Sequence, residues 1–221
     1  MSNRLRMVVG VMCAITLIAV CSFAATENKP VMKTVGIAAG DDVESAVLER
    51  VANFLKGELN FAISVRPVSK GFAKLSLEAQ TKELKGLLKP SDVCVVALVK
   101  EPGATLKQSI FVVTNVPPSM GIVNLTAINA AAEGQEKNDA LKELILRFDE
   151  KETMRAIGTM IGLTPCVNPQ CAMSQYDLKP LSDKMGRNFC PPCQGALEKR
   201  FPPDTSSGRP TASTNAVTVI K

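Results

Sequence analysis

Residues 93–99 read VCVVALV, an unbroken run of apolar side chains rich in β-branched valine. A strand covered by helices on both faces has this composition, whereas a strand with one solvated face alternates polar and apolar residues. The run therefore predicts the central strand of a sheet that lies between helices. Cys94 falls inside it, where we expect a buried and inert thiol.

Segments of strand and helix character alternate on both sides of this run, which predicts an α/β fold rather than a helix bundle. Strands are expected at 34–39, 61–68, 110–114 and 121–126. Helices are expected at about 42–57, 76–88 and 138–163, with a loop at 129–138 before the last of them. Asp41 and Glu44 have the spacing of a capping box for the first helix, and Pro67 places its strand at an edge or an end.

The first 24 residues have the organisation of a secretory signal peptide. Two arginines precede an apolar run of about fourteen residues, and a small-x-small cleavage sequence ends at Ala24. The run is shorter than the roughly twenty residues that cross a bilayer, which argues against a retained anchor. Lipidation at Cys21 is disfavoured because the bulky Val20 precedes it. We therefore expect a secreted or periplasmic protein with no membrane contact after cleavage.

The amino-acid composition limits the classes of molecule that the protein is expected to bind. The chain of 221 residues has a formal net charge of +5, one tyrosine, no tryptophan and no long basic run. Nucleic-acid binding is not expected, because it requires basic residues clustered on one surface. Residues 25–200 have the length of one ordinary domain, and the polar segment 201–221 is expected to be a disordered tail. The sequence leaves the oligomeric state open.

Four cysteines near the end of the chain form the strongest motif, in a protein without histidine: Cys166, Cys171, Cys190 and Cys193. The spacing Cys-x4-Cys-x18-Cys-x2-Cys lets two short loops each deliver two sulfur ligands to a tetrahedral zinc ion. Two disulfides are the alternative, because the expected destination is oxidising. The Cys-Pro-Pro-Cys segment, interpreted as a turn, favours two ligands facing one ion. We predict one structural zinc.

The stretch from Arg155 to Cys193 resembles the end of the archaemetzincins, which are zinc metalloproteases of the metzincin clan. Their pattern is His-Glu-x-x-His-x-x-Gly-x-x-His followed directly by Cys, then a second Cys, a methionine turn and Cys-x-x-Cys. Here residues 155–166 read RAIGTMIGLTPC. Eleven positions carry residues like those of the family: Gly158, Gly162, Leu163, Cys166, Cys171, Met173, Asp177, Lys179, Phe189, Cys190 and Cys193.

The same resemblance implies that the catalytic site has been lost. The three histidine ligands of the family fall on Arg155, Thr159 and Pro165, and its general-base glutamate falls on Ala156. Arginine stays protonated, alanine and proline have no donor atom in their side chains, and one threonine hydroxyl is a weak ligand. A catalytic zinc needs about three protein ligands and a water molecule. None of the four positions is therefore expected to be catalytic.

Other residues of the matching stretch imply that the fold of the family is kept although its catalytic ligands are not. The resemblance implies a mixed, twisted sheet with flanking helices over residues 33–128. A long helix and a zinc-binding part with the four cysteines would follow over residues 138–200. Gly162 is expected to turn the chain off the helix in a left-handed conformation and deliver Cys166. Met173 is expected to be a core residue.

Three acids precede Arg155 on the long helix: Asp149, Glu150 and Glu152. A carboxylate cluster can hold a hard cation weakly, but a solvated acidic face that also carries Lys151 is the interpretation that we favour. The sequence thus predicts a catalytically inactive pseudo-metalloprotease that binds peptides or proteins, or regulates them. The alternative is a zinc-dependent metallopeptidase with a non-standard ligand set. A third hypothesis is a structural envelope protein that zinc only stabilises.

Overall fold

The computed structural model describes residues 32–100, 110–114, 119–132, 134–136, 138–175 and 185–202. All of them fall within one structural unit, Met32–Lys221. The predicted signal peptide and residues 203–221 of the predicted tail lie outside the described residues. Within the described ranges, no helix combines the length and apolar character that crossing a bilayer requires.

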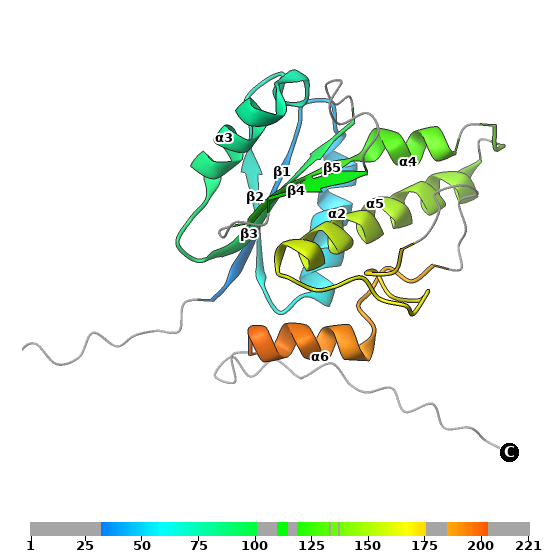
Figure 1. Cartoon of the computed structure of the whole chain (residues 1–221). Helices are drawn as coiled ribbons and strands as arrows, with labels where there is room; N and C mark the ends of the chain where they lie inside the picture. The colour runs from blue at the N-terminus through cyan, green and yellow to red at the C-terminus, as the bar shows by residue number, and fades with distance from the viewer. Residues whose placement is uncertain are drawn as a thin grey trace, which may run out of the picture. The chain divides into compact units, whose positions relative to one another are not determined.

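Five strands form one mixed sheet with the order β2-β1-β3-β5-β4 (Figure 1). They are β1 (Thr34–Ala39), β2 (Ala62–Pro67), β3 (Asp92–Val99), β4 (Phe111–Val113) and β5 (Ser119–Asn124). Neighbouring strands are parallel except β4, which runs antiparallel to β5. The predicted α/β fold with a mixed sheet is confirmed. The strand that contains Pro67 is an edge strand, as predicted.

The centre of the sheet is β3, which is buried on both faces as its apolar run predicts. Alternate side chains enter separate cores, Cys94, Val96 and Leu98 on one face and Val95, Ala97 and Val99 on the other. Cys94 is fully buried, and burial raises the pKa of its thiol to about 12. A thiol in this state is neutral at physiological pH, which confirms the prediction for Cys94.

Helices cover both faces of the sheet (Figure 1). The helices α2 (Ser45–Glu58), α4 (Leu125–Ala131) and α5 (Asp139–Met160) share the core of one face. The helix α3 (Leu77–Leu87) and the 3-10 turn η1 (Phe72–Lys74) pack on the other face. A last helix, α6 (Pro191–Arg200), begins directly after Cys190 and contains Cys193. This arrangement places α5 against β3, β4 and β5.

Two segments differ from the sequence prediction. The region predicted as a loop from residue 129 includes the end of α4, whose first turn Asn124 caps by accepting a hydrogen bond from Thr126 N. The Cys-Pro-Pro-Cys segment begins α6 instead of forming an isolated turn. Proline suits the first position of a helix, because that position needs no N–H donor.

The predicted capping box is wrong. The carboxylate of Asp41 accepts the Gly71 N–H at 3.1 Å, so it does not cap α2. Glu44 is the N-cap residue without a side-chain capping bond, and its carboxylate pairs with Lys100 at 2.9 Å. Both carboxylates are therefore engaged in tertiary contacts, which the local sequence does not reveal. Phe201, the first residue of the predicted tail, packs its ring edge-on against Phe61 with 5.3 Å between centroids.

Candidate functional site: a thiolate cluster beside an altered active-site helix

The end of α5 is a tight left-handed turn at Gly162. Gly162 has a φ of 85°, and its N–H donates to the Thr159 carbonyl at 3.0 Å. The next N–H, that of Leu163, donates to the Gly158 carbonyl at 2.8 Å. These two bonds form a Schellman motif, which satisfies the last carbonyls of the helix. The turn directs the chain away from α5 and toward Cys166.

The thiols of Cys166, Cys171, Cys190 and Cys193 converge on one point. Their Sγ atoms all lie within 4.8 Å of one another, and those of Cys166 and Cys190 are 3.7 Å apart. A tetrahedral zinc with Zn–S bonds of about 2.3 Å separates its sulfurs by about 3.8 Å, whereas a disulfide needs about 2.05 Å. All four cysteines are free thiols. The cluster therefore fits one tetrathiolate metal ion.

Backbone N–H groups donate hydrogen bonds to a sulfur of this cluster. Met173 N and Cys190 N each donate to Cys171 Sγ at 3.4 Å. Burial opposes ionisation of Cys190, which lies at the start of α6. Hydrogen bonds from Cys193 N–H and from the neighbouring thiols outweigh this effect and lower its pKa to about 7. Burial raises the pKa of Cys171 and Cys193 instead, so Cys190 is the cysteine whose surroundings favour the thiolate form that binds metal.

The methionine turn packs directly beneath α5. Met173 is buried, and its carbonyl accepts the Cys166 N–H at 3.0 Å. A side-chain carbon at Gly158 would overlap the Met173 sulfur and approach the Phe189 ring at 3.0 Å. The absence of a side chain at Gly158 thus lets the thiolate-bearing loops lie close to the helix. Asp177 and Lys179, which also match the family pattern, lie outside the described residues.

The positions at which the resemblance places metal ligands remain open to solvent. Between residues 148 and 160 of α5, Arg155 and Thr159 are the two residues that are not buried. Pro165 is exposed, and Ala156, at the general-base position, is fully buried. The Thr159 hydroxyl donates to the Arg155 carbonyl at 2.9 Å. None of these four side chains offers a strong metal ligand.

Arg155 is held in place by a buried anion and an aromatic ring. Its Nη2 lies 2.8 Å from the Glu152 carboxylate, which is fully buried, while the Arg155 side chain keeps 15% of its surface exposed. The guanidinium carbon lies 4.9 Å from the centre of the Phe111 ring on β4. We call the surface formed by Phe111, Val113, Arg155 and Thr159 the β4–α5 face. It carries the Arg155 guanidinium at the position where the resemblance places the first histidine ligand.

The expected solvated acidic face on α5 is wrong. Asp149 and Glu150 are each 3% exposed, and Glu152 is fully buried. Lys151 is 2% exposed, and its ammonium group lies 3.1 Å from the Ser174 hydroxyl. Burial lowers the pKa of Lys151 to about 8. The physical reason is that other elements surround this part of α5, and that Arg50 of α2 and Arg187 supply cations that balance Glu150.

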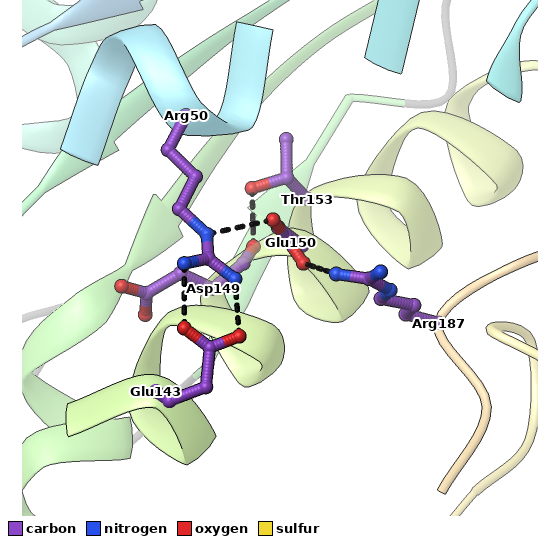
Figure 2. A network of polar contacts seen from close by, with 6 residues as sticks. All are labelled: Arg50, Glu143, Asp149, Glu150, Thr153 and Arg187. Carbon is purple, nitrogen blue, oxygen red and sulfur yellow. Dashed lines mark hydrogen bonds and ion pairs between the residues drawn. The ribbon is translucent and has the colours of Figure 1, made fainter. Parts of the chain in front are cut away.

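Figure 2 shows how cations from distant segments compensate these acids. Glu150 accepts Arg50 Nε at 2.9 Å and also pairs with Arg187. The other two guanidinium nitrogens of Arg50 bind Glu143 at 2.6 and 2.7 Å. The sequence analysis assigned no role to Arg50 or Arg187, and the excess of acids on α5 was the only signal that pointed to such partners. The network ties α2 and the segment before α6 to α5.

Asp149 differs from the other acids of α5. Its carboxylate points away from Glu150 and Arg50 (Figure 2). Its Oδ1 is buried and has no hydrogen-bond partner among the described residues. Burial raises the pKa of this carboxyl to about 8. Asp149 is therefore largely protonated at neutral pH.

Comparisons with known proteins support the fold. No protein-family model matches the chain, and no curated protein matches its sequence. The structure of an archaemetzincin from Methanopyrus kandleri matches with a TM-score of 0.57 at 19% identity, over 79% of this chain and 98% of that one. An archaemetzincin from Archaeoglobus fulgidus, complexed with malonate, matches with a TM-score of 0.52 at 20% identity, over 73% and 98% of the two chains.

A zinc-dependent peptidase from Methanocorpusculum labreanum matches with a TM-score of 0.54 at 19% identity. The match covers 74% of this chain and 99% of the peptidase. At such identities the likeness establishes the fold. The chain therefore has the archaemetzincin fold, as its C-terminal motif implied.

The contact between Gly158 and the methionine turn predicts the effect of one added methyl group. Gly158→Ala should lower the free energy of unfolding by about 1–3 kcal/mol, because the new carbon overlaps Met173 in a packed core. The matched control is Gly86→Ala in α3, where no atom lies within 4 Å of the added carbon. That variant should gain about 0.5–1 kcal/mol from helix propensity. Urea denaturation measures both, and an equal gain in the two variants would contradict the packing.

The raised pKa of Asp149 predicts that the free energy of unfolding depends on pH. The carboxyl has a pKa of about 3.9 in the unfolded chain and about 8 in the folded one, so the folded state holds the proton more tightly. Its contribution to stability is present at pH 4 and is lost as the pH rises toward 8. Asp149→Asn should therefore raise the free energy of unfolding at pH 8 by on the order of a few kcal/mol, with no gain at pH 4.

The control for Asp149 is Asp139→Asn at the start of the same helix, where the carboxylate is 97% exposed. It should leave the pH profile of the wild type nearly unchanged. Denaturation of the three proteins from pH 4 to pH 8 provides the comparison. Parallel profiles for wild type and Asp149→Asn would show that Asp149 ionises normally.

Proposed function

We propose that this protein is a secreted, catalytically inactive archaemetzincin-like protein that binds extended peptides and carries one structural zinc ion. The observation that carries the proposal is the Arg155–Glu152 ion pair at the position of the first catalytic ligand. A guanidinium has no lone pair for a metal and repels it instead.

The described residues offer no replacement ligand set at the β4–α5 face. Among them, the four cysteines form the only group of three or more His, Cys, Asp or Glu side chains arranged to hold a metal ion. Glu150 is engaged by Arg50 and Arg187, and Glu152 by Arg155. These pairings favour an inactive protein over a peptidase with a non-standard ligand set.

The structural zinc is proposed for the cluster of Cys166, Cys171, Cys190 and Cys193. Four sulfur ligands fill a tetrahedral ion, so it would have no position for a water molecule and would serve to stabilise the fold. The ligands come from the loop after α5 and from the start of α6. Zinc bound there would join the two segments that lie on either side of the methionine turn. The signal-like N-terminus supports export of the protein.

Peptide binding is proposed for the free edge of β4. Backbone groups of Ile110 and Thr114 hydrogen bond to β5, and the alternation of an antiparallel strand therefore turns those of Phe111 and Val113 outward. In the described part of the chain, no strand pairs with this outer side. An edge of this kind accepts an extended peptide as an additional strand.

The proposal predicts one zinc ion per chain and no peptidase activity in the purified mature protein. Four thiols should react only after a chelator removes the metal, because the buried Cys94 is protected by the core. Cleavage of casein should not rise above the background of the buffer, with or without added zinc. Elemental analysis, thiol titration and a casein assay on one preparation provide these measurements.

Two variants serve as controls for the metal site. Cys171→Ser should lose the zinc, because it removes a ligand from the middle of the cluster. Cys94→Ala also removes one buried cysteine, but it should keep the zinc because Cys94 lies in the sheet. Two zinc ions per chain together with chelator-sensitive cleavage would reject the proposal in favour of the peptidase. Four reactive thiols without any bound metal would reject the zinc site.

A further inference from the structure

We propose that residues 216–220 of the chain's own tail dock on the outer edge of β2 and add a sixth strand to the sheet. The inference concerns the edge opposite to β4 and does not depend on the proposed peptide binding there. It gives the two edges of the sheet different roles. One edge is covered by the chain itself, and the other is left to a partner.

The outer edge of β2 presents backbone groups to an incoming strand. Ala62 N donates to the Lys33 carbonyl at 2.9 Å, so Ala62 turns its backbone groups toward β1. Residues of a strand alternate in this respect, and Ile63 and Val65 therefore turn their backbone groups outward. In the described part of the chain, no strand pairs with that side of β2. An edge of this kind is a template for a further strand.

The side chain of Val65 provides an apolar contact at the same edge. It is 51% exposed, although its partner on β1 is the fully buried Ile37. Ile63 lies on the same face of β2 and packs against the core that contains α2. A strand added beside β2 would cover Val65 with the side chains that it places on this face.

The tail contains one segment with strand character. Residues 202–215 read PPDTSSGRPTASTN and are polar or turn-forming, whereas residues 216–220 read AVTVI. From residue 217 to residue 220 every side chain is β-branched, and the segment has no charge, glycine or proline. Because strand side chains alternate, Val217 and Val219 would lie on one face of the added strand, beside Ile63 and Val65 of β2.

The described end of the chain lies beside the start of β2. The Phe201 ring packs edge-on against Phe61, the residue before β2, with 5.3 Å between centroids. Fully extended, residues 202–215 span at most roughly 45 Å, while a strand of the length of β2 is about 20 Å long. The linker is therefore long enough for residues 216–220 to lie along β2 in either direction.

This attachment favours the chain's own tail over a second copy and β2 over β4. Addition of one short strand is a weak interaction between separate molecules, but a short linker holds the segment at an effective concentration in the millimolar range. The free edge of β4 lies four strand spacings from β2, which is about 19 Å. The edge next to Phe201 is thus the nearer of the two.

Hydrogen exchange of single backbone amides tests the docking, measured by NMR on the zinc-loaded mature protein. The amides of Ile63 and Val65 should exchange about tenfold or more slowly in the wild type than in the double variant Val217→Asp/Val219→Asp. Aspartate disfavours the strand conformation and cannot cover the apolar side chain of Val65. The protection should not change with protein concentration.

The matched control is Ser213→Asp/Asn215→Asp, which adds the same charge to the linker and should keep the protection. Zinc content and the exchange of the β3 amides establish that each variant is folded.

Four results would overturn the inference. Rapid exchange of the Ile63 and Val65 amides in the wild type would show that the edge is open. Equal protection in the wild type and in the variant with aspartate at 217 and 219 would assign the cover to another part of the molecule. Protection that rises with protein concentration would assign the docking to a second copy. Loss of protection at Phe111 and Val113, instead of at β2, would place the tail at β4.

Discussion

The ion pair between Arg155 and Glu152 is the interaction on which the character of this protein depends. Glu152 is fully buried, and a carboxylate in that environment requires a cation close to it. Arg155 supplies that charge from one turn further along α5 and extends toward Phe111 on β4. Removing either partner would break a buried ion pair, at a cost of about 3–5 kcal/mol. Arg155, which lies where the resemblance places the first histidine ligand, is therefore also required by the core.

The requirement that a buried charge be paired or neutralised also applies to the rest of α5. Its middle section is surrounded by other elements, so each charged side chain there is either paired or neutralised. Glu150 is paired with Arg50 and Arg187, while Asp149 keeps its proton because burial raises its pKa to about 8. The helix thus carries a connected set of polar contacts where an active-site helix would carry ligands. These contacts hold α2 and the loop before α6 against α5, next to the thiolate cluster.

The sequence predicts the parts of this structure that depend on local composition. The apolar run 93–99 gives the central strand, and the spacing of the four cysteines predicts a cluster that the geometry bears out. The alternation of helices and strands identifies the α/β class. The archaemetzincin motif predicts the fold that the solved structures share. These signals lie within short stretches of chain.

What could not be predicted depends on contacts between distant segments. Arg50 lies 93 residues before Glu143 and 100 residues before Glu150, so no sequence period reveals that it neutralises both. For the same reason, the burial of Asp149 and Glu150 cannot be predicted from the sequence. Without knowledge of those partners, a charged stretch on a helix is correctly expected to be solvated. The helix α6 was missed because its two prolines are also typical of turns.

Anomalous diffraction at the zinc edge tests the central claim most directly. Crystals of the mature protein grown with excess zinc should show one strong anomalous peak, surrounded by the sulfurs of the four clustered cysteines. The account predicts no peak near Arg155 and Thr159, because a fixed guanidinium occupies the place of the first ligand. A second peak there, bound by side chains of this protein, would contradict it.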